Sequence, residues 1–535
     1  CININKKIAF AFGCKQMEDI RLHYFAVKEY EVKKNGQKKI NDMVGDKVEI
    51  IISDISSFEF SMLYMKAFNP VENIIVYWDE PTISLDCEES PLHEIIHKNW
   101  EINIIPNMIL SSATLPSPHE IPNTITSFKQ KFNDSQHFCI STHDYFKTIC
   151  VLSKDGTIVM PHKMFKDYDK VLSSAKYLEE NKTLLRYLDL GQCSNFIIYV
   201  CEYVFNNVNN KQHLLVENYF QNIEEVNVIN IKLYYLKLLQ NVPSHYWNIV
   251  YDYFQANNKK IPCDAYIATN SAFTLTHGPT IYISNEINKL AKFCISTSNI
   301  PKNVLDQISQ NMNHNREILQ LICKKEKDLE DGLAKDSENE NKLANNRISE
   351  DLKNIQREIE KYIKNLKNIM LDDEYIPNRS SHYEKWGNKE LSFSKTNAFT
   401  SSMDEQLVEN IMLLNDVEPI WKLLLLMGIG ALKLDNSPSY NEIMKTMAYN
   451  QQLYIIITSS DYIYGTNYQF CHSYIGKDLE DITQEKLIQA LGRVGRKNIQ
   501  QNYSIRFRND SIIEKIFIKS DYNPEITNMN KLFNI

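Results

Sequence analysis

Four short, almost wholly apolar runs in the first 115 residues constrain the fold more than any other feature of this chain. They are Lys6–Phe12, Val48–Ser53, Ile74–Trp78 and Met108–Ser111, and helical or loop-like segments separate them. Strands that are apolar on both faces are typical of parallel sheets that helices cover on both sides. The sequence therefore predicts an α/β fold, in which ligand chemistry gathers at the C-terminal ends of the strands.

Length, charge and cysteine content limit the number of domains, the partners and the kinds of site that we expect. At 535 residues the chain is too long for one hydrophobic core, so we expect several domains. Its net charge of −8 provides no overall basic field, and a nucleic-acid partner would need a local basic channel. The 11 cysteines include no CxxC pair, which predicts free thiols rather than disulfides or zinc sites.

No segment has the length and composition of a membrane span. The apolar run Trp421–Gly428 is far shorter than the roughly 20 residues that a helix needs to cross a bilayer. The sequence contains no recognisable signal peptide. We therefore expect an intracellular protein, not a secreted one, without a membrane partner.

Two carboxylates follow the third apolar run. Asp79 and Glu80 stand at its C-terminal end, in the string DEPT. One such carboxylate can hold Mg²⁺, usually through water, and a second can orient an attacking water molecule. The alternative is an acidic turn without a chemical role. Asp79 and Glu80 are therefore candidate catalytic residues, and Asp79 is the candidate metal ligand.

A second polar segment lies far along the chain, near residue 490. It contains Gln489, Arg493 and Arg496, together with two glycines, in the pattern QxxGRxGR. A guanidinium group binds phosphate oxygens bidentately and stays charged, and glycines let the backbone approach a ligand closely. The segment thus suits a polyphosphate, although a helix C-terminus with exposed arginines and a glycine cap is a common structural alternative.

Together these motifs resemble those of superfamily 2 helicases of the DExH, Ski2-like type, which are DEAD-like proteins. DEPT, then SSAT at 111–114, then QxxGRxGR follow one another in the family's order. The string YIYGTN at 462–467, which follows an apolar run at 453–458, resembles the family's fifth motif. Composition and insertions suggest the branch found in large DNA viruses.

The resemblance implies two RecA-like lobes with ATP and Mg²⁺ bound between them and DNA or RNA crossing both. Asp79 would carry Mg²⁺ and Glu80 would activate water. Ser112 and Thr114 would couple hydrolysis to lobe movement. The remaining implied site residues are Gln489, Arg493 and Arg496 at the nucleotide, and Asp461, Gly465, Asn467 and Gly492 at the nucleotide or the nucleic acid.

One part of the family pattern is missing. No GxxxxGK[ST] phosphate loop occurs in the 535 residues. In the family this loop precedes the acidic motif, and here Cys1 leads almost directly into the first apolar run. We therefore expect the chain to be a fragment of a longer polypeptide whose N-terminal part carries the loop. As given, it should bind ATP poorly and hydrolyse it hardly at all.

A heptad seam predicts a helical hairpin within residues 302–371. Its apolar residues, at 348, 352, 355, 359, 362, 366 and 369, alternate in steps of four and three. An earlier helix near 302–331 precedes it across a polar turn, which favours an intramolecular antiparallel hairpin over a dimeric coiled coil. The hairpin offers a surface for a protein partner.

These features divide the chain into six segments. They are 1–150, the remainder of the first lobe; 151–262, a helical insertion; 263–301, the start of the second lobe; 302–403, the hairpin and a polar linker; 404–510, the rest of the second lobe; and 511–535, a C-terminal tail. The predicted architecture is two α/β lobes interrupted by helical insertions.

Three functions are compatible with these motifs. The first is an ATP-dependent helicase or translocase, and the second is a catalytically silent helicase relative that binds nucleic acid or serves as a scaffold. The third is suggested by DEPTISLD at 79–86, which resembles the Walker B and D-loop of ABC-type ATPases. However, the segment at 53–70 has no glycine for an LSGGQ-like signature, and SSAT stands where such ATPases carry a histidine.

Overall fold

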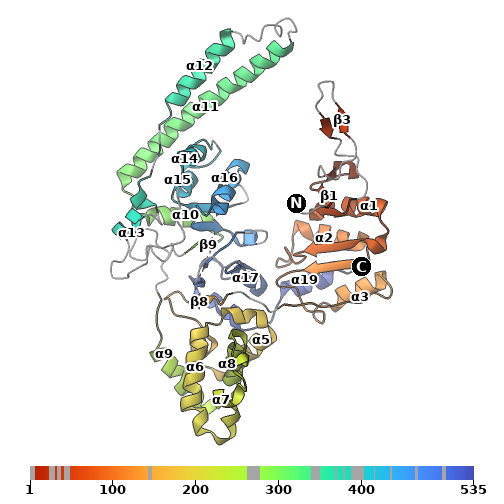
Figure 1. Ribbon diagram of the computed structural model, residues 1–535, viewed down its shortest axis with the longest axis vertical. Helices are drawn as coiled ribbons and strands as arrows, with labels where there is room; N and C mark the ends of the chain where they lie inside the picture. Colours follow the sequence, from red (N-terminus) through yellow and green to blue (C-terminus); the bar gives the residue numbers. More distant parts are fainter. Residues whose placement is uncertain are drawn as a thin grey trace. The chain divides into compact units, whose positions relative to one another are not determined.

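The computed structural model describes residues 6–22, 30–32, 38–40, 48–142, 147–261, 278–338, 350–367, 369, 371–376, 380–386, 403–414, 416–433, 437–463, 468–496 and 502–534. The chain forms two compact units (Figure 1). The first consists of Cys1–Thr142, Thr483–Gln489 and Ser520–Ile535, and the second of His143–Ile482 and Ala490–Lys519.

The first unit contains a strand in each of the four predicted apolar runs. β1 (Ile8–Ala11) pairs in parallel with β5 (Ile50–Ser53), and β2 (Arg21–Leu22) pairs with the other edge of β1 in the antiparallel sense. β6 (Ile75–Asp79) pairs in parallel with β7 (Asn107–Ser111). Their C-terminal ends, at Asp79 and Ser111, therefore lie side by side.

Helices cover one face of the β6–β7 pair. They are α2 (Pro91–Ile102), α3 (Pro122–Lys131) and α19 (Pro524–Leu532). Trp78 and Leu110 point into this layer and pack with Trp100 and Phe533 in one apolar cluster. The ring centroid of Phe533 lies 5.4 Å from that of Trp78 and 5.1 Å from that of Trp100.

The opposite face of the same pair is bare within the described part of the chain. Ile75, Tyr77 and Ile109 point to it and are 64%, 61% and 47% exposed. Tyr77 is the register partner of Ile109, so these side chains form one contiguous apolar surface. The strands are apolar on both sides, but only one side has a covering layer.

The C-terminal segment belongs to the first unit, which differs from the tail predicted for 511–535. Its helix α19 buries Met529, Leu532 and Phe533 in the cluster around Trp100. These residues recur at three- and four-residue steps, so they share one face of the helix. The segment packs because that face is apolar.

The second unit is built on a six-stranded sheet in which every strand is parallel to its neighbours. The order is β10-β11-β9-β12-β13-β8. The strands are β8 (Cys150–Leu152), β9 (Thr280–Ile283), β10 (Ile429–Leu432), β11 (Ile455–Thr458), β12 (His472–Ile475) and β13 (Ser504–Phe507). This confirms the mixed α/β class with a parallel sheet between helices.

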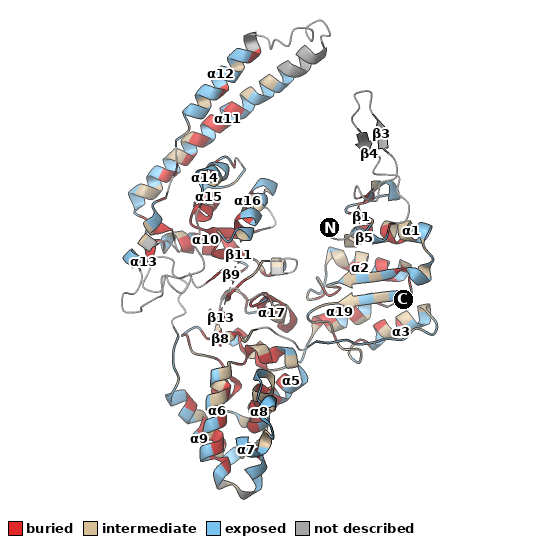
Figure 2. Cartoon of the chain, viewed as in Figure 1, coloured by how far each residue is buried: buried red, intermediate tan, exposed pale blue. Residues whose placement is uncertain are grey.

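Helices pack beside this sheet, and its central strands are buried throughout (Figure 2). These helices include α10 (Ile287–Ser296), α15 (Pro419–Leu426) and α16 (Pro438–Tyr449). A further helix, α17 (Gln484–Leu491), belongs to the first unit as far as Gln489. One edge strand, β8, comes from the boundary predicted between the first lobe and the helical insertion. The sheet therefore begins 113 residues before the expected start of the second lobe at 263, since β8 starts at Cys150.

A group of helices follows β8 in sequence, as predicted for 151–262. Its main members are α5 (Tyr168–Glu180), α6 (Leu190–Tyr203), α8 (Val228–Asn241) and α9 (Ser244–Ala256). Lys232 of α8 is fully buried, and its ammonium donates to the Thr148 hydroxyl at 2.9 Å and the Leu185 carbonyl at 2.8 Å. These bonds tie the helices to the segment that precedes β8.

The predicted helical hairpin is present in the second unit. α11 (Lys302–Glu338) lies beside α12 (Glu350–Lys364), and its exposed sides are pale blue in Figure 2. Ile318 and Ile322 of α11 pack with Ile355 and Ile359 of the predicted seam. Seam position 348 lies outside the described residues.

In the part of the chain that the structure describes, no helix is long and apolar enough to cross a membrane. The nine cysteines in this part are all free thiols.

The bare sheet face predicts a contrast between two identical substitutions. Ile75→Ala should lower the free energy of unfolding by about 1 kcal/mol or less, since it removes mainly β-propensity. Ile96→Ala, in the covered layer, should cost about 2–5 kcal/mol because it leaves a cavity. Urea unfolding followed by circular dichroism measures both values. Equal losses would show that the Ile75 face is covered in solution.

Candidate functional site

The predicted carboxylate pair stands at the C-terminal end of β6. Asp79 is the last residue of the strand and is exposed, and Glu80 follows it. Glu80 has a backbone φ of +49°, and its N–H donates to the Ser111 carbonyl at 2.7 Å. A non-glycine residue in this left-handed region costs about 1–3 kcal/mol, and such strain clusters at functional sites. The neighbouring strand thus fixes an unfavourable backbone that sets the direction of the Glu80 side chain.

The SSAT string lies directly beside these carboxylates. The Ser112 hydroxyl donates to Glu80 Oε2 at 2.7 Å and lies 3.3 Å from the hydroxyl of the fully buried Thr82. The backbone N–H of Thr114 donates to the Ser112 hydroxyl at 3.3 Å. A single serine side chain therefore connects the DEPT motif with the following threonine.

Gln489 reaches the same place from the QxxGRxGR segment. Its Nε2 donates to the Thr114 hydroxyl at 2.6 Å, across 375 positions of sequence. Gln489 is only 3% exposed, so this bond is shielded from water. Hydrogen bonds thus link Glu80, Ser112, Thr114 and Gln489 in a continuous chain within the first unit.

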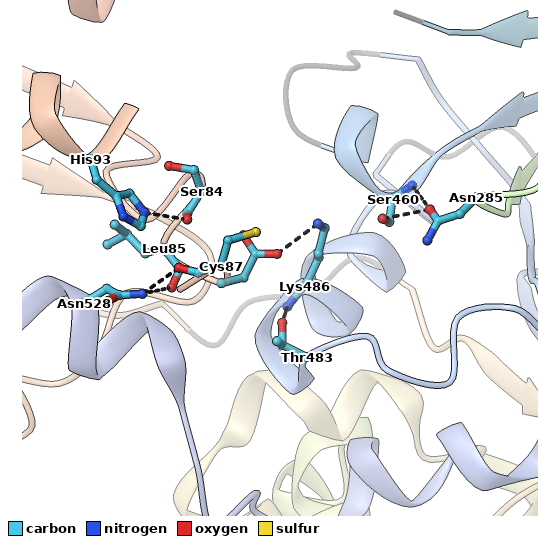
Figure 3. A network of polar contacts seen from close by, with 10 residues as sticks. Ser84, Leu85, Cys87, His93, Asn285, Ser460, Thr483, Lys486 and Asn528 are labelled. Atoms are coloured by element: carbon cyan, nitrogen blue, oxygen red, sulfur yellow. Dashed lines mark hydrogen bonds and ion pairs between the residues drawn. The ribbon is translucent and has the colours of Figure 1, made fainter. Parts of the chain in front are cut away.

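A nearly buried ion pair holds the loop that follows the carboxylates. The Lys486 ammonium lies 2.9 Å from Asp86 Oδ2, and the two side chains are 12% and 8% exposed (Figure 3). Lys486 precedes Gln489 by three positions on α17, so the two residues lie on the same side of the helix. The pair anchors the helix to the loop, and removing one partner of such a pair typically costs about 3–5 kcal/mol.

Helix α19 holds this loop from another side. Asn528 Nδ2 donates to the carbonyls of Leu85 and Cys87, each at 2.9 Å (Figure 3). Across the loop, a His93 ring nitrogen lies 2.9 Å from the Ser84 carbonyl oxygen. The turn after DEPT is therefore fixed by side chains from three helices, α2, α17 and α19.

A fully buried carboxyl group, Glu525 of α19, completes the polar cluster. The Thr114 hydroxyl donates to its Oε2 at 3.4 Å, and its Oε1 has no hydrogen-bond partner among the described residues. Burial raises the pKa of Glu525 to about 9, and the negative charges of Glu485, Asp86 and Glu80 contribute in the same direction. Glu525 therefore carries a proton at neutral pH.

Sequence analysis missed Lys486, Asp86, Asn528 and Glu525. Asp86 lies within the DEPTISLD string, and Lys486 lies one helical turn before Gln489, so helical spacing was the available signal for the lysine. Glu525 and Asn528 fell in the predicted tail. No local pattern connects them with residues about 400 positions earlier.

The other described candidate residues lie in the second unit. Arg493 is 6% exposed, whereas Arg496 is exposed and its Nε donates to the Gly492 carbonyl at 3.2 Å. Gly495 has a φ of +71°, and its N–H donates to the Phe470 carbonyl at 2.9 Å. The glycine thus permits the turn between the two arginines to dock beside β12.

The predicted fifth motif is described in part. Asp461 is exposed in a short 3₁₀ turn after β11, next to Ser460. Asn285 Oδ1, from the loop after β9, accepts from the Ser460 N–H at 3.2 Å and from its hydroxyl at 3.0 Å (Figure 3). Gly465 and Asn467 lie outside the described residues.

The carboxylates suit Mg²⁺ bound mainly through water. Among the described residues, no three His, Cys, Asp or Glu side chains gather as a metal site. Mg²⁺ commonly binds through one or two carboxylates together with water and substrate phosphates. The exposed Asp79 fits that role, and the ion would neutralise phosphate charge beside Glu80.

The protonated state of Glu525 predicts a pH-dependent stability. In the unfolded chain its pKa returns to about 4.5, so the folded state holds one more proton between about pH 4.5 and 9. Stability from this group is therefore fully present below pH 4.5 and is lost as pH rises toward 9, by at most about 1.4 kcal/mol per pH unit. Glu525→Gln should be more stable than the parent chain at pH 8 and equal to it near pH 4.5.

Urea unfolding at several pH values measures this difference. Glu94→Gln, at an exposed position of α2, is the matched control and should show no such pH-dependent gain. If Glu525→Gln followed the control at every pH, Glu525 would be ionised in the folded protein.

No model of a known protein family matches this sequence, and no curated protein matches it.

Proposed function

We propose that this chain is part of an ATP-driven motor that translocates on or unwinds DNA or RNA. The observation that carries the proposal is the chain of hydrogen bonds through Glu80, Ser112, Thr114 and Gln489. It joins side chains of three motifs that lie far apart in the sequence. A nucleotide-driven conformational change requires that the group acting in hydrolysis, here Glu80, be linked to a distant segment that binds the phosphates, here the segment that contains Gln489.

Each residue has a definite role in this proposal. Asp79 holds Mg²⁺ through water, and Glu80 orients the water that attacks the γ-phosphate. Ser112 and Thr114 relay the state of Glu80 to Gln489. Arg493 and Arg496 stabilise the charge on the transferring phosphate, and Asp461, Gly465, Asn467 and Gly492 contact nucleotide or nucleic acid.

The two units correspond to two RecA-like lobes in this proposal. The six-stranded parallel sheet of the second unit supports this, because such sheets bind ligands beyond the C-terminal ends of their strands. Asp461 and Asn285 follow the C-terminal ends of two of these strands. The helical hairpin α11–α12 is then an accessory element that a protein partner can contact.

The motor also requires a phosphate-binding loop, which the 535 residues do not contain. We propose that a segment outside this sequence supplies it. The bare face of β6 and β7 supports this, because a helix packed there would cover Ile75, Tyr77 and Ile109 next to Asp79. If no such segment exists, the same missing loop favours a second function, a silent nucleic-acid-binding scaffold.

ATP hydrolysis with and without single-stranded DNA or RNA tests the proposal, on this chain and on the longest form that its gene encodes. The chain alone should hydrolyse ATP hardly at all, and the longer form should be stimulated by nucleic acid. Arg493→Ala should lower the stimulated rate of the longer form by about 10³-fold or more, since it removes charge stabilisation of the transferring phosphate. Nucleic-acid binding without nucleotide should change less than threefold.

Two control variants sharpen this experiment. Arg493→Lys keeps the charge but loses the planar fork, so it should recover little activity while preserving the fold. Arg357→Ala, on exposed α12, should leave the rate unchanged. Binding without hydrolysis in every form would instead establish the scaffold. Hydrolysis by the 535-residue chain that Glu80→Gln abolishes would refute the assignment of the loop to another segment.

A further inference from the structure

Residues near the C-terminal end of the described chain contact the candidate site at several points. We call the segment 520–534 the C-terminal clasp. Besides Asn528, its Asn523 Nδ2 donates to Glu485 Oε1 at 2.6 Å, and the Ser520 N–H donates to Gln484 Oε1 at 2.8 Å. The clasp therefore contacts both the loop after the carboxylates and the first turn of α17.

Apolar packing anchors the clasp independently of these polar contacts. Met529 and Phe533 are fully buried against α2, α3 and β6. Asn530 fastens the outer side, because its Nδ2 donates to the Glu120 carbonyl at 2.8 Å and its Oδ1 accepts from the Asn123 N–H at 3.1 Å. The helix has no need of a carboxyl group at 525 to stay in place.

We propose that Glu525 of the C-terminal clasp is a positioning residue, which fixes the Thr114 hydroxyl so that its oxygen receives the Gln489 amide. This inference rests on the proposed function, because it assigns Glu525 to the same relay. The geometry is a three-residue chain in which Gln489 Nε2 donates to Thr114 Oγ1 and Thr114 donates to Glu525 Oε2. Gln489 and Glu525 are 3% and 0% exposed.

The chemistry of a hydroxyl explains why an acceptor on one side matters. A threonine hydroxyl has one proton and rotates to suit its partners. An acceptor at Glu525 draws that proton away from Gln489, so that a lone pair faces the amide. Without Glu525, the proton can turn toward Gln489 and break the bond that links α17 to the end of β7.

The surroundings keep this acceptor neutral. The negative groups that face it are Glu485 from α17 and Asp86 and Glu80 from the loop after β6, and Asp86 is bound to Lys486. From α2, the His97 ring contacts the carbonyl of Leu532, at the far end of the helix. A neutral acid adds no charge to this cluster and still accepts the hydroxyl. Glutamine would do the same, which makes it the conservative replacement.

Hydrogen–deuterium exchange on the full chain tests the role without requiring ATP hydrolysis. Glu525→Ala should speed exchange in 107–116 and 484–491 by about tenfold, and Glu525→Gln should retain the parent pattern. Tryptophan fluorescence reports clasp docking, since Phe533 packs on Trp78 and Trp100, and Phe533→Ala gives the undocked reference spectrum. Both Glu525 variants should keep the docked spectrum.

Asn530→Ala is the matched control on the same helix. It weakens the outer contacts of the clasp and should leave exchange at 107–116 unchanged. If Glu525→Ala and Glu525→Gln both exchange like the parent chain, the proposal is overturned. It is also overturned if Asn530→Ala speeds exchange in the same segments to the same extent, because the carboxyl would then serve only the packing of the helix.

Two further measurements separate this proposal from the proposed function. Should Glu525→Ala fail to fold, Thr114→Val removes the same bond and must speed exchange at 484–491, whereas Thr114→Ser must not. In a form that hydrolyses MgATP, Glu525→Ala should lower kcat with little change in KM, and Glu525→Gln should restore it. Altered exchange in this chain, together with no hydrolysis by the longest form that the gene encodes, would sustain the positioning role and reject the motor. Hydrolysis with unaltered exchange would do the reverse.

Discussion

The packing of Phe533 between Trp78 and Trp100 is the interaction on which the first unit depends. A pair of strands is at best marginally stable in water without a layer packed on it. β6 and β7 obtain that layer on one face from α2, α3 and α19, where Trp78 of β6 packs with Trp100 of α2 in one apolar cluster. The strand ends that carry Asp79 and Glu80 are thus held partly by the end of the chain.

The polar cluster follows from this apolar packing. Because α19 is docked, it brings Glu525 into a region shielded from water, where several carboxylates already lie. A further charge there would be unfavourable, so the acid keeps its proton. The same exclusion of water strengthens the bond between Gln489 and Thr114, since hydrogen bonds are stronger in a region of low dielectric constant. The docking of α19 thus accounts for the burial of Glu525, for its protonation and for the shielding of the bond between Gln489 and Thr114.

Local sequence patterns predicted the parts of the fold that local patterns determine. Continuous apolar runs located β1, β5, β6 and β7, and heptad spacing located α12. A carboxylate after a strand located Glu80 and the resemblance located Ser112, and the structure brings these two side chains together. The contact of Gln489 with Thr114 was not predicted and could not follow from spacing, because 375 positions separate the two residues.

The features that were missed are short or depend on distant partners. β8 has three residues, too few to show a period. Helix α19 has nine residues, and its apolar face is recognisable only when the layer that receives it is known. Glu525 gives no sign in sequence of being neutral, since its raised pKa results first from burial and then from the charges of Glu485, Asp86 and Glu80, which come from elsewhere in the chain.

The first unit is discontinuous in sequence. Its residues come from three separate passages of the polypeptide, at 1–142, 483–489 and 520–535. The two later passages carry Gln489 and Glu525 and can dock only after residues 143–482 of the second unit have been synthesised. During synthesis the layer over β6 and β7 therefore stays incomplete while the second unit is made. A stop codon before residue 524 would remove α19 and leave Trp100 without its cover, so termination at this point damages a layer whose strands lie more than 400 positions earlier.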